Sequence, residues 1–274
     1  MAQIWFVTGS SRGLGMAVVE AALASGASVI ATARNPETLK SFSERFDTTR
    51  FLPLAVDVTN EEDVIAAVKA GHEKFGRIDV VVNNAGYANL ASVEDIDIRD
   101  FKAQMDTNFM GVVYTTKAVI PILRQQRSGH IFQVSSIGGR LGTPGLCAYQ
   151  SAKWAVGGFS SIVANEVAPF GVKVTVLEPG AMKTDWAGSS MHIPPISDPY
   201  KETVGSFAKM LQQISGNEVS LPDKVAAIIV KLSKADDVPL RLLIGPDAVE
   251  LGTQATQALA SSDKKWHDLS ISSV

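Results

Sequence analysis

A tyrosine and a lysine, Tyr149 and Lys153, stand four residues apart within a stretch of helical pattern. This spacing places both side chains on one face of a helix. A free tyrosine has a pKa of about 10 and is a poor base near neutral pH. A neighbouring ammonium group favours the phenolate and lowers that pKa, which suits the tyrosine to proton transfer with a developing alkoxide. The pair therefore predicts acid–base chemistry at a C–O bond.

A serine and an asparagine could complete this chemistry. Ser136 stands at the end of a predicted strand, and its hydroxyl could donate to a carbonyl oxygen and stabilise the charge that develops there. Ser135 is the alternative for this role. Asn108 lies inside a long helical pattern, although asparagine is a mediocre helix former. The alternative for Asn108 is a polar residue that packs between helices.

A glycine-rich turn, with Gly9, Gly13 and Gly15, stands between the first predicted strand and a predicted helix. Glycines let the backbone bring its amides close to a pyrophosphate, and the helix N-terminus supplies aligned N–H dipoles. The spacing Gly-x-x-x-Gly-x-Gly differs from the commonest dinucleotide fingerprint, Gly-x-Gly-x-x-Gly. A purely structural turn is the alternative, but the position between strand and helix favours a dinucleotide cofactor.

Basic residues near the end of the second predicted strand favour one form of that cofactor. An acidic residue at this point would bind the adenosine ribose of NAD and repel a 2′-phosphate. The strand ends instead in Ala33, followed by Arg34, whose guanidinium suits a phosphate. Arg12, in the glycine-rich turn, could add a second positive charge. We therefore expect NADP (NADPH); the alternative is that Arg34 is a solvated loop residue.

Taken in order along the chain, these motifs resemble the short-chain dehydrogenase/reductase family, in its single-domain branch. That family has Thr-Gly-x-x-x-Gly-x-Gly, Asn-Asn-Ala-Gly, a catalytic Asn, a Ser and Tyr-x-x-x-Lys. This chain has all of them, as Thr8 to Gly15, Asn83 to Gly86, Asn108, Ser136, and Tyr149 to Lys153. Each motif alone is weakly specific, but the whole series is very specific. The match runs from about residue 3 to Thr184.

The resemblance implies a role for each catalytic residue. Tyr149 is the proton-transferring acid or base, and Lys153 also holds the nicotinamide ribose. Ser136 binds the carbonyl oxygen, because it precedes Tyr149 by 13 residues, the separation that this family typically has. Asn108 bends its helix and positions a water that links Lys153 to bulk solvent.

The resemblance also implies how the cofactor is bound. Thr184 bonds the nicotinamide carboxamide, and Asp57 contacts adenine unless it is an ordinary loop aspartate. Ala85 and Gly86 allow close backbone approach, whereas Asn83 is more structural. The residues expected to bind the cofactor are Gly9, Ser11, Arg12, Gly13, Leu14, Gly15, Arg34, Asp57, Val58, Asn84, Ala85, Gly86, Tyr149, Lys153, Pro179, Gly180 and Thr184.

Short apolar runs alternate with longer helical patterns, which is typical of a parallel sheet covered by helices on both faces. The predicted strands are Ile4–Thr8, Ser28–Ala33, Phe51–Val56, Asp79–Val82, His130–Ser135, Val172–Leu177 and Leu240–Ile244. The predicted helices lie near 13–25, 36–46, 60–75, 98–127, 149–168 and 221–235. We expect an α/β fold with a doubly wound parallel sheet of Rossmann type, in one domain over residues 1–274, with ligands at the carboxyl ends of the strands.

One long irregular stretch, near 181–220, interrupts this alternation. Such an excursion within a compact domain is usually a functional lid or a disordered segment. We interpret it as a lid over the site, with a passive surface insertion as the alternative. Its residues Trp186, Met191 and Phe207 could line an apolar substrate pocket or could only anchor the segment to the core.

Composition argues against several classes of protein. The net charge is −3 and neither sign forms a run of five, so we expect no nucleic-acid or membrane partner. No apolar run approaches the roughly 18 residues of a membrane span, and the N-terminus lacks the pattern of a secretory signal. Cys147 is the only cysteine, which excludes an intrachain disulfide. We expect a cytoplasmic protein, and no metal site, because the histidines lack metal-ligand spacing.

The leading hypothesis is an NADP-dependent carbonyl reductase or alcohol dehydrogenase. It would transfer a hydride between nicotinamide and a small-molecule ketone or aldehyde, bulky and apolar, with a secondary alcohol in reverse. A catalytically silent NADP-binding regulatory protein is one alternative, although the intact Ser136, Tyr149 and Lys153 count against it. An epimerase or dehydratase of the same superfamily is another, but only about 90 residues follow Thr184. The resemblance implies a homodimer or homotetramer, paired through the helices that carry Asn108 and Tyr149.

Overall fold

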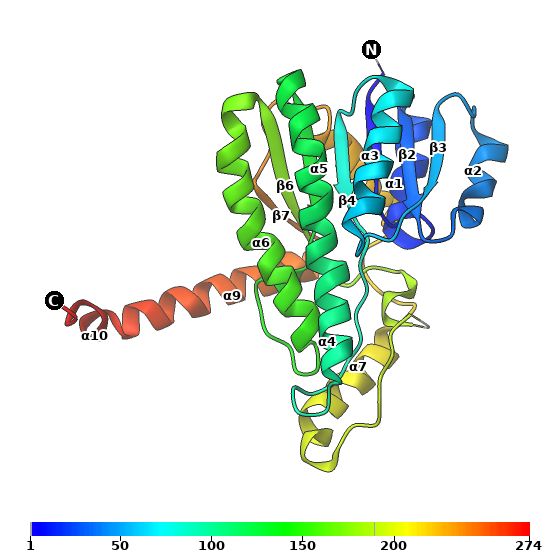
Figure 1. Cartoon of the computed structure of the whole chain (residues 1–274). Coiled ribbons are helices and arrows are strands. Elements are labelled where there is room, and N and C mark those ends of the chain that lie inside the picture. The colour runs from blue at the N-terminus through cyan, green and yellow to red at the C-terminus, as the bar shows by residue number, and fades with distance from the viewer. Residues whose placement is uncertain (1, 189) are drawn as a thin grey trace.

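The computed structural model describes residues 2–188 and 190–274. A sheet of seven parallel strands has the order β3-β2-β1-β4-β5-β6-β7 (Figure 1). The strands are β1 (Ile4–Val7), β2 (Ser28–Ala33), β3 (Phe51–Ala55), β4 (Val80–Asn83), β5 (Gly129–Val134), β6 (Val172–Pro179) and β7 (Arg241–Ile244). The prediction of a doubly wound Rossmann-type sheet is confirmed.

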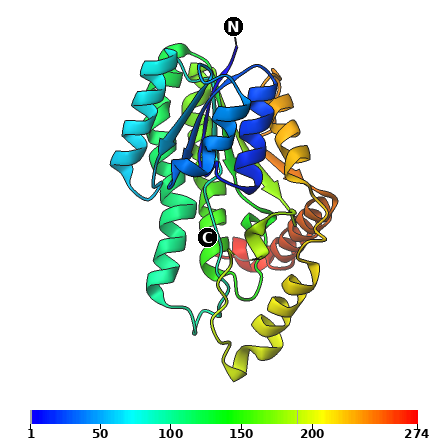
Figure 2. The ribbon, with the colours of Figure 1, turned by 90° about the vertical axis from the view of Figure 1, so that its right-hand side faces the viewer.

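Helices cover both faces of the sheet (Figure 2). On one face lie α1 (Gly13–Ala24), α2 (Lys40–Arg45) and α8 (Pro222–Leu232). On the other lie α3 (Glu61–Phe75), α5 (Gly111–Gln126) and α6 (Cys147–Val167). Among the residues that the structure describes, no helix is both long enough and apolar enough to span a membrane.

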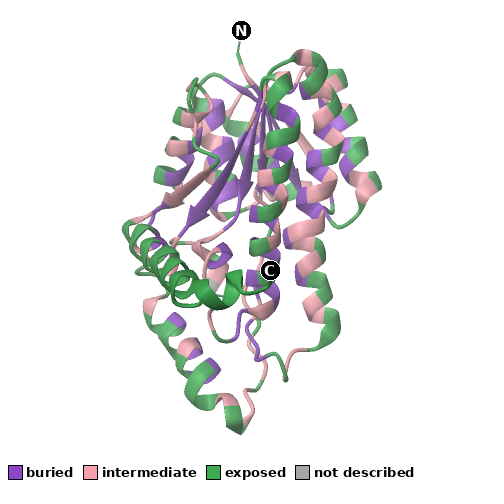
Figure 3. Cartoon of the chain, turned by 90° about the vertical axis from the view of Figure 1, so that its left-hand side faces the viewer, coloured by how far each residue is buried: buried purple, intermediate pink, exposed green. Residues whose placement is uncertain are grey.

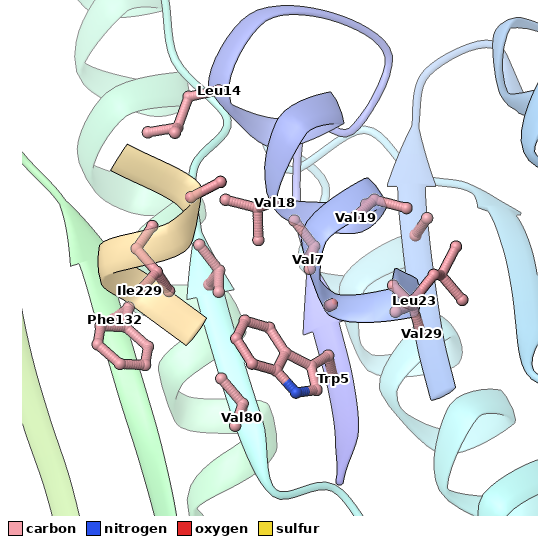
Figure 4. Close-up of a cluster of buried hydrophobic side chains, with 14 of the residues drawn as sticks. Trp5, Val7, Leu14, Val18, Val19, Leu23, Val29, Val80, Phe132 and Ile229 are labelled. Carbon is pink, nitrogen blue, oxygen red and sulfur yellow. The ribbon is translucent and has the colours of Figure 1, made fainter. Parts of the chain in front are cut away.

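The side chains of β1 alternate between two buried layers, as the pleat of a strand requires. Trp5 and Val7 join the layer under α1 and α8, whereas Ile4 and Phe6 join the layer under α3 and α5. Figure 4 shows Trp5 among Val80, Val18 of α1 and Ile229 of α8. Because truncating a buried aromatic side chain costs about 3–5 kcal/mol, this packing holds β1, and with it the glycine turn that follows, firmly in place.

The carboxyl ends of the strands form one edge of the sheet, and the predicted site residues follow several of them. The chain winds outward from β1 to β2 and β3, then crosses back to β4 on the other side of β1. In open α/β sheets such a switch point leaves a crevice where ligands bind. The segments after β1, β4, β5 and β6 therefore converge where a cofactor is expected.

The predicted lid is an excursion between β6 and α8 that lies beyond this edge of the sheet (Figure 1). Its two ends bond to each other: the Lys183 N–H donates to the Ser220 carbonyl oxygen (2.9 Å), and the Ser220 N–H donates to that of Ala181 (3.2 Å). The excursion contains a 3₁₀ turn, η5 (Asp185–Ala187), and the helix α7 (Ser206–Ile214). The base of the lid thus matches the predicted bounds.

A C-terminal arm, α9 (Pro246–Lys265) and α10 (His267–Ile271), extends away from the sheet (Figure 1) and is largely exposed (Figure 3). The first turns of α9 pack on the body, where Ala248 is fully buried, and the rest is exposed. The helical patterns in the sequence did not predict this arm. A signal was nevertheless present, because Pro246 and Asp247 after Gly245 are typical of a helix N-terminus.

Candidate active site

The glycine turn has the backbone that an anion site needs. Gly9 and Gly13 adopt positive φ angles of 66° and 54°. A Cβ on Gly15 would collide with the carbonyl oxygen of Gly9 and the side-chain amide of Asn84. The first turn of α1 has neither a side-chain cap nor an acidic residue, so its N–H groups stay available to an anion. The turn therefore fits the pyrophosphate of a dinucleotide.

Gly15→Ala should distort this turn, because the atoms around Gly15 belong largely to the backbone and cannot move aside. We expect a loss of about 1–3 kcal/mol in the free energy of unfolding, together with a loss of dinucleotide binding. Thermal unfolding and isothermal titration would measure the two. Gly158→Ala on α6 is the matched control, since nothing lies within 4 Å of its added Cβ. Normal dinucleotide affinity in Gly15→Ala would contradict this assignment.

Asn84 holds the glycine turn from the end of β4. Its Nδ2 donates to the carbonyl oxygens of Thr8 and Gly9, both at 3.0 Å. The Ala85 N–H donates to Thr8 Oγ1 (3.1 Å). Asn83 is buried and donates to the Gln133 side chain (2.8 Å), which agrees with the structural role expected for it. The Asn84 amide is thus engaged with the turn, and its neighbour Ala85 brings the backbone close to Gly9.

Two arginines stand near the adenosine end of the predicted cofactor site. Arg12 is the N-cap residue of α1, and Arg34 follows β2; both side chains are exposed. In the described part of the chain, neither takes part in an ion pair. The charge of Arg34 also acts on Tyr87, whose pKa is raised by burial first and by Asp100 next, with Arg34 opposing both.

The other residues predicted at the adenosine end of the cofactor site differ in exposure, and so in whether their side chains could contact the cofactor. Asp57 is exposed, and its Oδ1 accepts bonds from the Thr59 N–H (3.0 Å) and hydroxyl (2.8 Å). The side chains of Leu14 and Val58 are buried in the two apolar layers, so only their backbones could contact a cofactor. Ser11 is half-buried.

The structure brings Tyr149, Lys153 and Ser136 together at the end of β5. Tyr149 and Lys153 lie on α6 and are 8% and 4% exposed. Lys153 Nζ lies 5.5 Å from the centroid of the Tyr149 ring and donates to the Val134 carbonyl oxygen (2.8 Å). Ser136 Oγ accepts from the Gly138 N–H (3.0 Å), which leaves its own proton free to donate. Ser135 is buried and donates to the Lys153 carbonyl oxygen (3.2 Å), which favours Ser136 as the substrate contact.

Burial sets the proton affinities of this pair. It raises the pKa of Tyr149 to about 12, against a smaller opposite effect of a hydrogen bond with Ser136. Burial also lowers the pKa of Lys153 to about 8. For the chain alone, burial therefore raises the pKa of Tyr149, opposite to the lowering expected from Lys153. At neutral pH Tyr149 therefore carries its proton and can donate it.

Asn108 is fully buried in a π-helical turn, η2 (Asp106–Met110), that joins α4 (Ile98–Met105) to α5. Its Nδ2 donates to the carbonyl oxygens of Tyr87 (2.9 Å) and Gln104 (2.8 Å), and its Oδ1 accepts from the Tyr87 N–H (3.1 Å). A Cβ on Gly86 would lie 2.5 Å from Asn108 Oδ1 and 3.6 Å from Lys153 Nζ. The structure thus places Asn108 at an irregularity of the helix and next to Lys153.

The turn after β6 brings Pro179, Gly180 and Thr184 to the same edge. The Thr184 side chain lies 3.4 Å from where a Cβ on Gly13 would stand, so the start of the lid covers the glycine turn. A residue not predicted from sequence, Asp247 of α9, fixes this turn: its Oδ2 accepts from the Ala181 N–H (2.7 Å). A side chain on Gly180 would collide with that carboxylate.

A second unpredicted support is the carboxylate of Glu178, which is fully buried between two arginines. Arg140 Nε donates to its Oε2 (2.8 Å), and Arg241 Nε donates to its Oε1 (2.8 Å). The cluster joins the segment after Ser136, the end of β6 and the start of β7. A charged residue inside the apolar run of β6 was a signal for it.

An apolar cluster closes the site from the lid side. Tyr149 packs there with Leu90, Leu146 and Leu211, and with the lid residue Trp186. The Tyr149 and Trp186 ring centroids are 5.2 Å apart. The predicted lid residues Met191 and Phe207 belong to the same cluster. On the lid side the Tyr149 side chain therefore packs against hydrocarbon.

Comparison with known proteins agrees with this geometry. A family model described as short chain dehydrogenase matches residues 3–192. A curated relative, oxidoreductase BOA17 of Botryotinia fuckeliana, is 63% identical over 273 residues, which is 100% of both chains. A solved short-chain dehydrogenase from Streptomyces avermitilis is 33% identical, with a TM-score of 0.93 over 100% of both chains.

Two more distant solved structures carry cofactors. An alcohol dehydrogenase from Thermococcus sibiricus, complexed with 5-hydroxy-NADP, has a TM-score of 0.73 and 25% identity over 89% of this chain and 96% of its own. A 3-ketoacyl-(acyl-carrier-protein) reductase from Brucella melitensis, complexed with NADH, has a TM-score of 0.75 and 25% identity over 88% of this chain and 96% of its own. Proteins similar to this chain thus bind either nicotinamide dinucleotide.

Proposed function

The chain belongs to the short-chain dehydrogenase family and is an oxidoreductase, and from this premise we propose that it is an NADP-dependent carbonyl reductase. It reduces a ketone or aldehyde, and oxidises a secondary alcohol in reverse. The observation that carries the proposal is the buried pair of Tyr149 and Lys153, with the Ser136 hydroxyl within hydrogen-bonding reach of Tyr149.

In this proposal Tyr149 is the acid of the reduction. Its raised pKa keeps the hydroxyl protonated at neutral pH, so it can donate to the carbonyl oxygen as negative charge develops there. Ser136 donates to the same oxygen and stabilises that charge. The hydride comes from NADPH when it is bound. The apolar lid cluster excludes water around these groups, which strengthens their electrostatic effects.

Lys153 and Asn108 support the proton transfer. In its ammonium form Lys153 stabilises the phenolate that Tyr149 becomes after donation. Its Nζ lies near Asn108, and we propose that this asparagine and a water beside it link Lys153 to solvent, as the family resemblance implies. Through that link Tyr149 regains its proton after each turnover.

The residues for the dinucleotide follow the same edge of the sheet. The turn from Gly9 to Gly15, with Ser11 and Leu14 through its backbone, would hold the pyrophosphate. Asp57 and Val58 would contact adenine, Asn84 to Gly86 would line the channel, and Pro179 to Thr184 would cover the nicotinamide. NADP preference rests on Arg12 and Arg34, exposed cations at the adenosine end, rather than on the solved neighbours, which carry both dinucleotide types.

The proposal predicts how the reduction depends on pH. Since the pKa of Lys153 is lowered to about 8, its ammonium form is complete well below that pH and is lost as the pH rises through it. We expect kcat for ketone reduction to be level below about pH 7 and to fall about tenfold per pH unit well above the Lys153 pKa. A pH profile of kcat in buffers of constant ionic strength measures this. A rate that rises through this range would contradict the role of the ammonium group.

The substrate is proposed to be bulky and apolar, because the Tyr149 side chain packs against hydrocarbon side chains of the lid. The direct experiment is a screen of NADPH oxidation, followed by absorbance, against ketones and aldehydes of increasing size. We expect turnover to improve with apolar bulk. Absence of turnover with every carbonyl, in protein that binds NADPH, would refute the reductase.

We also propose that the protein is a cytoplasmic homodimer or homotetramer of single-domain subunits. An apolar groove between α5 and α6, the helix pair through which the family often associates, supports the assembly. It is lined among others by Ile120, Pro121, Phe159, Val163 and Phe170. Light scattering coupled to gel filtration measures the assembly, and a monomeric mass at micromolar concentration would contradict it.

A further inference from the structure

Trp186 is a lid residue whose ring lies against the ring of Tyr149. The planes of the two rings are tilted by 57°, with centroids 5.2 Å apart. The backbone N–H of Trp186 donates to Thr184 Oγ1 (3.3 Å), which fixes its backbone at the start of the lid. Trp186 is therefore a lid residue in direct contact with the proposed acid.

The indole N–H of Trp186 is buried, and no atom in residues 2–188 and 190–274 accepts a hydrogen bond from it. Other tryptophans of this chain are placed differently. Trp5 donates to the Gln3 side chain (3.3 Å), Trp154 donates to the Leu141 carbonyl oxygen (3.5 Å), and Trp266 is 51% exposed. A buried donor without an acceptor costs free energy, so such a group in a native protein calls for a partner, and next to the proposed acid that partner can be a substrate.

We propose that the Trp186 indole N–H donates to a second oxygen of the substrate, beside the carbonyl that Tyr149 and Ser136 hold. This inference rests on the proposed reductase function and narrows its substrate class. The preferred substrates are apolar ketones with a second acceptor oxygen a few bonds from the carbonyl, as in a keto ester. The hydrocarbon part of such a substrate faces Ala88, Leu90, Leu146, Val204, Ala208 and Leu211.

The test compares keto esters with alkyl ketones of equal length. In each alkyl ketone, one methylene group replaces the ester carbonyl group and another replaces the single-bonded ester oxygen. A series of substrates with the ester one, two or three carbons from the ketone shows which distance between the two groups gives the highest kcat/KM. Trp186→Phe keeps an aromatic ring against Tyr149 and removes the N–H. With NADPH, this variant should lower kcat/KM for the preferred keto ester about 10- to 100-fold and leave the matched alkyl ketone within about twofold of wild type. Unchanged reduction of the alkyl ketone also shows that the variant is folded.

Trp154→Phe is the matched control, because its indole is exposed on α6 and bonded to Leu141. It should leave both substrates unaffected. Equal losses for the two substrates in Trp186→Phe would overturn the proposal, since the indole would then act through packing alone. No loss for either substrate would overturn it as well.

Binding can be separated from turnover by nuclear magnetic resonance. The indole N–H resonance of Trp186 is assigned by its absence from the Trp186→Phe spectrum. In the complex with NADP, a keto ester should shift this resonance and the alkyl ketone should shift it less. An equal response to both would overturn the proposed contact, whereas a selective shift without any NADPH oxidation would refute the reductase and retain the contact.

Discussion

Tyr149→Phe is expected to lower kcat for ketone reduction at least about 1,000-fold while changing the Kd for NADPH less than about threefold. The substitution removes the hydroxyl proton that the carbonyl oxygen must receive and keeps the ring that packs against Trp186. The loss is large because the wild-type hydroxyl carries its proton at neutral pH, whereas a phenylalanine ring has none to donate. Single-turnover loss of NADPH absorbance, at saturating ketone, measures the effect on the chemical step.

Tyr114→Phe is the control for this prediction. It makes the same change on α5, where the side chain packs against the buried layer under α3 and α5, to which Ser136 does not belong. Its kcat should equal that of wild type. If Tyr149→Phe kept more than about a tenth of the wild-type rate, the proton would have to come from another group, and the proposed role of Tyr149 would be refuted.

Arg34→Asp is expected to weaken NADPH binding about 100- to 1,000-fold and NADH binding less than about threefold. The guanidinium would lose charge-assisted hydrogen bonds to the 2′-phosphate, and the new carboxylate would repel it. NADH lacks that phosphate and presents ribose hydroxyls, which a carboxylate can bind. Isothermal titration of the two dinucleotides gives the ratio directly.

Lys69→Asp on the exposed side of α3 makes the same change of charge at another surface position. It should leave both affinities as they are, which separates a local contact from the general field of the protein. Equal weakening of NADPH and NADH by Arg34→Asp would contradict the 2′-phosphate contact. Arg12→Ala should then be measured in the same way, because both arginines belong to the proposal.

Most of the sheet could be predicted because its strands are buried on both faces. Such strands are continuous apolar runs, and the run Ser28–Ala33 is β2 residue for residue. The pattern over 98–127 predicts one helix, whereas the structure has α4, the π-turn η2 and α5. The interruption lies at Asn108, where the family resemblance implied a bend. The exposed C-terminal arm was not predicted, because a helix without a buried face has few apolar residues at regular helical spacing.

Contacts between distant segments were the part of the site that sequence spacing could not predict. The spacing of Tyr149 and Lys153 predicted one shared helix face, which the structure has. It also predicted a lowered pKa for Tyr149, and this was wrong because burial is a property of the whole fold. The bond from Ala181 to Asp247 joins residues 66 positions apart. No local pattern encodes such a pair.

The central claim is that this chain moves a hydride from NADPH to a carbonyl carbon while Tyr149 supplies the proton. The most direct measurement uses NADPH deuterated at nicotinamide C4, on both faces, with an apolar ketone, and determines the mass of the product. We predict an alcohol that carries one deuterium on the carbinol carbon with the wild-type protein, and no such alcohol above background with Tyr149→Phe. Alcohol without deuterium, or equal yields from the two proteins, would contradict the account.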